Sequence, residues 1–169
     1  VAQTFAGAGT VLTNLGVVSL QNTSGLTITH MNQIITLRVN LFNGTITNSN
    51  KITLGIGSGS AISQIGYSGN TLIGGSFDVA PTFNIGTGTY TLFYSQESAT
   101  RTTGFELPPS RIIHNATINN TSGVNLSGGD LTIGTSAAAG LLTLTAGILD
   151  AGSSSVILPF TGTSISGGS

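Results

Sequence analysis

Short alternating segments recur about every eight residues along this chain, and this spacing limits the possible folds more than any other feature. In each segment Leu or Ile alternates with Thr or another small polar residue, as at residues 26–29, 35–38, 45–48 and 52–55. Alternation with a period of two places the apolar side chains on one face of an extended strand. The pattern returns after residue 111, at residues 116–118, 124–126, 131–133, 141–145 and 156–158. The sequence therefore predicts an all-β fold with no helix of note.

Two turn sequences point to different ways of pairing these strands. Asn22-Thr-Ser-Gly-Leu26 is echoed by Asn120-Thr-Ser-Gly-Val124, and such quasi-repetition favours stacked turns. Phe42-Asn-Gly-Thr45 carries Asn-Gly between alternating apolar runs, which is typical of a hairpin. We expect a β-solenoid or β-helix of stacked strands with some antiparallel hairpin pairing, and a β-sandwich is the alternative.

We expect one continuous domain made of two β regions. Residues 1–110 form the first and contain an aromatic middle segment, while residues 111–169 form the second, with repeat-like strands. Where one face of a strand is buried, the alternation fixes which side chains point inward. The predicted inward residues are Ile35, Leu37, Val39, Ile52, Leu54, Ile56, Leu131, Ile133, Leu142 and Leu144.

Charge is scarce. Only 5% of the 169 residues are charged and the formal net charge is -1, whereas about a quarter of the residues in an average soluble domain carry a charge. Binding to nucleic acid through a basic surface is excluded. No apolar run approaches the roughly 20 residues that a membrane-spanning helix needs, so we expect no membrane insertion.

Both ends of the sequence have the form of a short apolar strand without a nearby partner. The chain begins at Val1 without an initiator Met or a signal peptide, which indicates a processed chain or a segment of a longer one. Soluble monomers usually protect strand edges with charges, but the ionisable side chains nearest the two ends are His30 and Asp150. We therefore expect head-to-tail joining between copies through terminal assembly strands, marked by Val1, Phe5, Val11, Val156, Leu158 and Phe160.

Two stretches, Val124-Asn-Leu-Ser-Gly-Gly-Asp-Leu-Thr-Ile-Gly134 and Leu142-Thr-Leu-Thr-Ala-Gly-Ile-Leu-Asp150, resemble segments of repeat-bearing secreted surface proteins of Bacteroidota. Thr103-Gly-Phe-Glu-Leu-Pro-Pro-Ser-Arg111, followed by Thr117-Ile-Asn-Asn-Thr121, is similar to a linking block of the same proteins. Those proteins are large, exported and rich in β-solenoid-like segments. The resemblance implies a secreted or cell-surface location and a structural or adhesive role, and it supplies no catalytic residues.

The densest group of ionisable residues consists of Glu97, Arg101, Glu106, Arg111 and His114. A carbohydrate-active β-helix enzyme would use Glu97 and Glu106 as its acid and base. We expect instead that this Pro-containing segment connects two β regions, with Arg and Glu pairing to satisfy it. The chain is therefore predicted not to be an enzyme, with no catalytic residue, no metal site and no cofactor.

Asn-x-Ser/Thr sequons are the most informative chemical feature. They fall at predicted turns, where a glycan would find an exposed Asn, although a chain this rich in Asn, Ser and Thr also produces sequons by chance. The glycosylation candidates are Asn22, Asn43, Asn115, Asn119, Asn120 and Asn125.

The expected function is that of a structural subunit of an extracellular or cell-surface fibre, whose partners are copies of itself and attached glycans. The alternative is a carbohydrate-binding adhesin or a stalk module of a large surface protein. Exposed aromatic side chains would favour the adhesin and buried ones the fibre. The aromatic residues in question are Phe77, Phe83, Tyr90, Phe93 and Tyr94.

Overall fold

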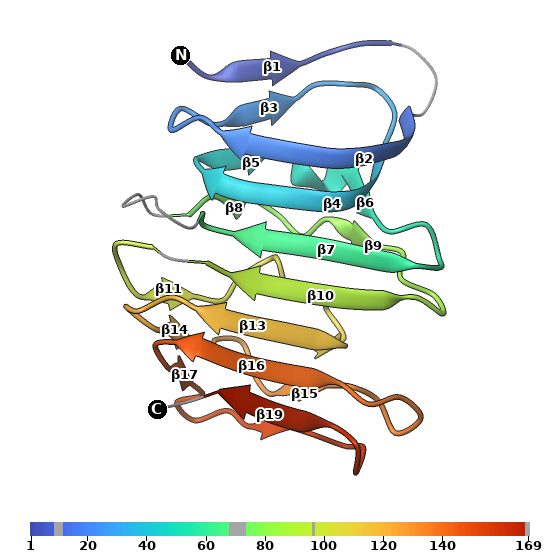
Figure 1. The fold of residues 1–169 in the computed structure, drawn as a ribbon. Coiled ribbons are helices and arrows are strands. Elements are labelled where there is room, and N and C mark those ends of the chain that lie inside the picture. The colour runs from blue at the N-terminus through green and yellow to red at the C-terminus, as the bar shows by residue number, and fades with distance from the viewer. Residues whose placement is uncertain (9–11, 68–73, 96, 168–169) are drawn as a thin grey trace.

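The computed structural model is an all-β solenoid in which the chain winds through about six turns (Figure 1). It describes residues 1–8, 12–67, 74–95 and 97–167, without the side chains of residues 12–14. Every strand pairing among the described residues is parallel. The two ends of the chain lie at opposite ends of the stack (Figure 1).

One face of the solenoid is a long sheet to which every turn contributes a strand. Its strands are β2 (Leu12–Gln21), β4 (Ile34–Asn43), β7 (Ser60–Ile65), β10 (Thr89–Tyr94), β13 (Asn115–Asn119), β16 (Leu141–Ala146) and β19 (Ser164–Gly167). Because β10 pairs with β13, this sheet runs without a break across residue 110, where the sequence predicted the change between two β regions.

Shorter strands form the second face, in two groups. The upper group contains β1 (Gln3–Phe5), β3 (Leu26–Ile28), β5 (Thr45–Thr47) and β8 (Ser76–Phe77). The lower group contains β11 (Arg101–Thr102), β14 (Val124–Asn125) and β17 (Leu149–Asp150).

A third set of strands completes the later turns. A 3₁₀ turn, η1 (Ser49–Lys51), leads into β6 (Ile52–Leu54), which pairs with β4 and with β9 (Thr82–Phe83). Further along the stack lie β12 (Ile112–Ile113), β15 (Leu131–Ile133) and β18 (Val156–Ile157). Three strands per turn explain the spacing in the sequence, because three segments about eight residues apart make one turn.

The interior consists of columns of side chains that stack from turn to turn. Strand register on the long sheet defines two of them, in which most members are buried apolar residues. The first runs Val18, Val39, Ser63, Leu92, Ala116, Leu142 and Ile165, and the second runs Leu20, Leu41, Ile65, Tyr94, Ile118 and Leu144.

Most of the predicted inward side chains are found in the core. The buried members are Val39, Ile52, Leu54, Leu131, Ile133 and Leu142, whereas Leu144 is half-buried in an interior column.

Three inward predictions are wrong or only partly right. In the first four residues of β4 the buried positions are Ile34 and Thr36, and Ile35 and Leu37 are half-buried. The alternation changes phase after Thr36, whose hydroxyl donates a hydrogen bond to the carbonyl oxygen of Arg38 (2.9 Å). Ile56 is exposed, because it lies in the glycine-rich connection between β6 and β7 rather than in a strand.

The predicted antiparallel hairpin at Asn43-Gly44 is also wrong. The flanking strands β4 and β5 belong to different sheets, and each pairs in parallel with strands of the adjacent turns. Gly44 makes a corner of the solenoid at φ 79°, where an added Cβ would lie 2.0 Å from the carbonyl oxygen of Asn22. The close contact between successive turns and the positive φ both require glycine here.

Candidate functional site

Both ends of the solenoid present strands that pair on one side only. At the first turn, β1 pairs with β3 and β2 pairs with β4. At the last turn, β17, β18 and β19 pair with β14, β15 and β16. No further described strand covers either end. The described strands therefore leave an open parallel edge at each end of the stack (Figure 1).

The apolar interior is open at the C-terminal end. Ile165 lies in register with Leu142, so its side chain is on the interior side of the sheet. Leu142 is 4% exposed, but Ile165 is 55% exposed. The difference arises because the turn that would cover Ile165 is missing from the described chain.

The predicted assembly residues lie at these two ends. Val1 is exposed, and Phe5 is half-buried with its ring centroid 5.8 Å from that of His30. Val11 lies outside the described residues. At the other end the half-buried residues are Val156, Leu158 and Phe160.

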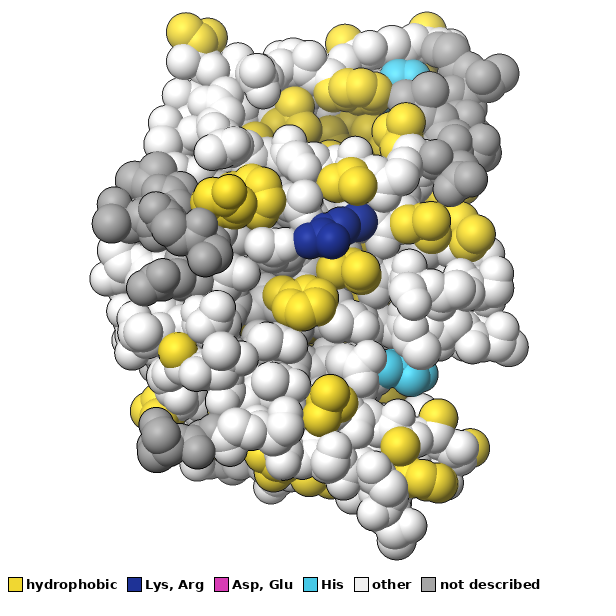
Figure 2. Space-filling view, in the orientation of Figure 1, with side chains coloured by type: hydrophobic (Ala, Val, Ile, Leu, Met, Phe, Trp, Pro, Cys, Tyr) yellow, Lys and Arg dark blue, Asp and Glu magenta, His cyan; other side chains and the backbone are white. Residues whose placement is uncertain are grey.

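The outer surface of the long sheet is polar but nearly uncharged. On the face drawn in Figure 2, the described side chains show one Lys/Arg patch and no Asp or Glu. On the outer face of β4, Arg38 donates hydrogen bonds to Asn40 (2.7 Å) and to Gln64. Hydroxyl and amide side chains also bond from turn to turn, as Asn115 does to Thr91 (3.2 Å). Such a surface gives little electrostatic repulsion between copies.

The two Asn-Thr-Ser-Gly turns have the same hydrogen bonds. In each turn the Asn Oδ1 accepts from the backbone N–H two residues later, at 3.0 Å for Asn22 and 3.1 Å for Asn120. Each Asn Nδ2 donates to the carbonyl oxygen of the turn's glycine and to one in the preceding turn of the solenoid. These asparagines thus close a corner and tie it to the turn before.

The structure separates the sequons by exposure. Asn125 is exposed, and its side chain makes no hydrogen bond among the described residues. Four others, Asn22, Asn43, Asn115 and Asn119, are half-buried. Asn120 is fully buried, and its Nδ2, the atom to which a glycan would attach, donates to Ala99 (3.3 Å) and Gly123 (3.0 Å).

The two glutamates that the sequence singled out are buried. Glu97 is 3% exposed, and the carboxylate of Glu106 accepts hydrogen bonds from the Tyr94 hydroxyl and the Gly104 N–H, both at 2.8 Å. Burial raises the pKa of Glu97, and the nearby charge of Arg101 opposes that rise. Neither carboxylate lines the surface pocket that residues 103–111 form with the neighbouring turns. Both side chains therefore belong to the packed interior of the solenoid.

The expected pairing of Arg with Glu is not found among the described residues. Arg101 donates instead to the carbonyl oxygens of Gly74 (3.1 Å) and Gly75 (2.7 Å), and Arg111 to those of Gly129 and Asp130. Backbone carbonyls at the corners of a solenoid need donors, and a guanidinium group can satisfy two at once. His114 stands apart from this group: its Nδ1 accepts a hydrogen bond from the Tyr90 N–H (3.1 Å), and burial lowers its pKa.

Sequence reasoning missed one feature, a pocket formed by residues 103–111 with parts of the neighbouring turns. The only signal in the sequence was the Pro-containing interruption of the strand pattern at Pro108 and Pro109. Among the described residues, no three His, Cys, Asp or Glu side chains gather into a possible metal-binding group. No described helix is long and apolar enough to span a membrane.

These ends, corners and pocket have to be interpreted from their own geometry. Comparisons with protein-family models, with curated proteins and with solved structures gave no match.

Proposed function

We propose that this chain is a structural segment of a fibre in which β-solenoids join end to end through their terminal strands. The observation that carries the proposal is Ile165, an interior residue of the stack that is left 55% exposed at an open edge. Covering this side chain with another turn removes apolar surface from water. The backbone groups of the last turn gain parallel ladder partners at the same time.

The two ends of the solenoid are suited to each other. The last turn presents β17, β18 and β19, and the first turn presents β1 and β2, all from parallel ladders. Stacking the first turn of one copy on the last turn of another can continue two of the three ladders in the same direction, β17 with β1 and β19 with β2, and leaves β18 without a counterpart. The contact joins two different surfaces, so it repeats without closing and produces a filament.

Apart from Asp150 in β17, the edge strands carry no Lys, Arg, Asp or Glu that would oppose such pairing. No Lys, Arg, Asp or Glu occurs before Arg38 or after Asp150. Charges on an edge strand are a common way for soluble proteins to prevent association. A secreted or cell-surface setting fits the uncharged surface, and glycans on exposed sequons such as Asn125 would supply solubility.

The adhesin alternative is less well supported. Phe77, Tyr90 and Tyr94 are buried, and the ring of Phe83 packs against that of Tyr90 at 5.4 Å between centroids. Phe77, Tyr90 and Tyr94 fill the interior and are not available to stack on a sugar, whereas Phe83 is half-buried in the wall of an open pocket. Of the five, Phe93 alone points outward from the long sheet, and it is half-buried.

The test places a charge on the open interior. We expect Ile165→Lys to abolish end-to-end assembly of the purified chain, followed by light scattering and electron microscopy, because a lysine there cannot be buried without a partner. The matched control is Ile157→Lys in the same last turn. Ile157 is also exposed, but it lies in register with the outward Thr132, so this control should assemble like the unmodified chain.

A second variant tests the other end. Deleting residues 1–9 removes β1 and should also prevent assembly, while circular dichroism still reports a β-rich fold. Fibres that form equally well from Ile165→Lys, or a chain that stays monomeric at high concentration, would contradict end-to-end joining.

A further inference from the structure

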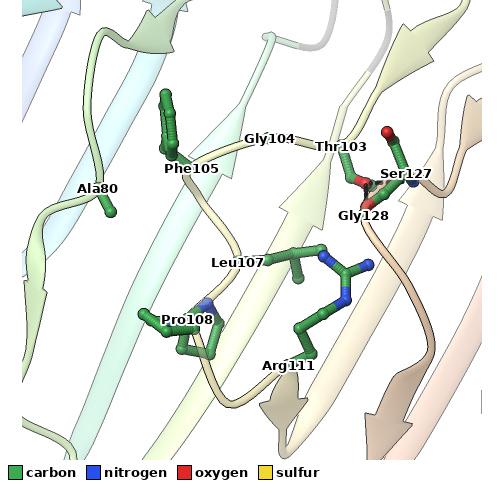
Figure 3. Close-up of a pocket in the computed structure, with 10 residues that line it drawn as sticks. Ala80, Thr103, Gly104, Phe105, Leu107, Pro108, Arg111, Ser127 and Gly128 are labelled. Atoms are coloured by element: carbon green, nitrogen blue, oxygen red, sulfur yellow. Dashed lines mark hydrogen bonds between the residues drawn. The ribbon is translucent and has the colours of Figure 1, made fainter.

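Residues 103–111 form a pocket on the side of the solenoid. They connect β11 to β12, whereas the corresponding connection in the next turn spans only residues 126–130. The longer connection lines an open pocket of about 410 Å³ together with Ala80 from the turn before and Ser127 from the turn after (Figure 3). Cavities of roughly 300 to 1,000 Å³ are typical of small-molecule sites.

Arg111 is the one ionisable residue among those that line this pocket. Its φ of 53° lies in the left-handed region, which residues other than glycine rarely adopt and which is often retained at functional sites. Nε donates to the carbonyl oxygen of Asp130 (2.8 Å) and Nη2 to that of Gly129 (2.9 Å). These bonds fix the guanidinium and leave Nη1 beside Gly128, with no hydrogen-bond partner among the described residues. A guanidinium held in this way is preorganised for an anionic oxygen.

The rest of the lining is apolar with hydroxyl groups at one side. Phe105 is 48% exposed, and Leu107 and Pro108 continue the apolar wall. Ser127 and Thr103 lie opposite (Figure 3). Thr103 Oγ1 accepts from the Ser127 N–H (2.9 Å) and donates to the Ser127 carbonyl oxygen (3.4 Å), so the hydroxyl of the exposed Ser127 is the one left for a ligand. A sugar ring has the matching chemistry, because its C–H faces pack on apolar rings and its edges carry hydroxyl groups.

We propose that this pocket binds a carboxylated pyranose, the uronic-acid unit of an acidic polysaccharide. The sugar carboxylate accepts a hydrogen bond from Nη1 of Arg111, and the sugar ring packs against the ring of Phe105. The cavity is large for an inorganic anion, and the lone positive charge selects an acidic sugar over a neutral one. This binding site is independent of the proposed fibre function, because none of its residues lies at an end of the solenoid.

The test is a titration of the isotope-labelled chain with trigalacturonate, followed by amide chemical shifts. We expect shifts confined to residues around Thr103, Phe105 and Gly128, and weaker binding at higher salt. Arg111→Asn removes the charge but keeps a residue that tolerates positive φ, and it should weaken binding at least about tenfold. Phe105→Ala, at an exposed position, should weaken binding without changing thermal unfolding. Arg38→Gln on the long sheet is the control and should bind like the unmodified chain.

Three further ligands decide whether the sugar assignment holds. The methyl ester of trigalacturonate lacks the charge and should not bind. Equal binding of this ester, or unchanged binding by Arg111→Asn, would overturn the proposal. Sulfate producing the same shifts at the same concentration would reduce the pocket to a general anion site. Tighter binding of N-acetylphenylalanine would assign it to a peptide carboxylate instead.

Discussion

The sequence Asn-Thr-Ser-Gly occurs at residues 22–25 and again at residues 120–123, with the same hydrogen bonds but different burial. Asn22 is half-buried and Asn120 is fully buried. One turn after each corner lies a glycine, Gly44 in the first case and Gly147 in the second. Its backbone is so close to the Asn carbonyl oxygen that there is no room for a Cβ. The local sequence therefore sets the shape of the corner, and its position in the stack sets its burial.

The difference follows from what lies on either side. The corner at residues 22–25 is preceded only by the first turn, whereas the corner at residues 120–123 has several turns before it and the last turn after it (Figure 1). In a stacked fold each turn contacts only its neighbours, so stability is a sum of turn and interface contributions. End turns lack one of these interfaces, and the same side chain contributes less there.

The largest expected difference is in the first interior column. Leu142→Ala should lower the free energy of unfolding by about 2 to 5 kcal/mol, the range for truncating a buried Leu. Ile165→Ala, at the open end of the same column, should lower it by less than about 1 kcal/mol in the monomer because little apolar area is lost. Urea unfolding measures both. Equal losses would mean that the end of the column is covered in solution.

The corners should differ next. Asn120→Ala removes two donated hydrogen bonds and one accepted bond in a buried setting, which should cost about 2 to 4 kcal/mol. Asn22→Ala removes the same bonds where water can replace them, and about 1 kcal/mol is expected. The comparison fails if Asn22→Ala is as damaging as Asn120→Ala in urea unfolding.

Period-two alternation was sufficient to predict the strands and most of the core, and the repeated turn sequence predicted the stacking. The echo of Asn22 at Asn120 correctly indicated equivalent corners. Alternation is the same in a hairpin and in a solenoid turn, so Asn43-Gly44 was misinterpreted. The phase change in β4 coincides with a hydrogen bond from the Thr36 hydroxyl to the Arg38 carbonyl oxygen, and no sequence pattern shows it.

The pocket could not be predicted from the sequence for a different reason. Its lining joins Ala80, residues 103–111 and Ser127, which belong to three successive turns. Their proximity depends on which segments stack, and that requires the number of residues in each turn. The irregular length of the turns hides this register from any fixed repeat.

Two acidic side chains should respond to pH in opposite directions. Burial raises the pKa of Glu97 above 4.5, because the neutral carboxyl group is easier to bury than the charged one. The contribution of Glu97 to folding stability is therefore fully present below pH 4.5 and is lost as the pH rises through the folded pKa. Burial also acts to raise the pKa of Asp78, but hydrogen bonds from the Ser49 hydroxyl and from the backbone outweigh it and lower that pKa below 3.8. Asp78 therefore stabilises the fold above pH 3.8, and this contribution is lost on acidification.

Unfolding free energies measured across a pH series separate the two groups. Glu97→Gln should remove the decline on the alkaline side of pH 4.5 and raise stability at neutral pH. Asp78→Asn should instead flatten the loss on the acid side of pH 3.8. A neutral-pH stability that is unchanged by Glu97→Gln would mean that Glu97 is solvated.

The smallest effect on stability is expected from glycans, because they attach where the fold leaves an Asn free. Asn120 and Asn125 are neighbouring sequons in the same turn of the solenoid, but only Asn125 is exposed. Attachment to Asn120 would break the bonds from its Nδ2 to Ala99 and Gly123 and bring a polar sugar to a buried corner. Glycopeptide mass spectrometry of the native chain should therefore find carbohydrate on Asn125 and none on Asn120.

Enzymatic removal of the glycan should leave urea unfolding nearly unchanged. An intact mass equal to that of the bare polypeptide would remove glycans from the proposed fibre, and carbohydrate on Asn120 would mean that this corner opens before or during modification.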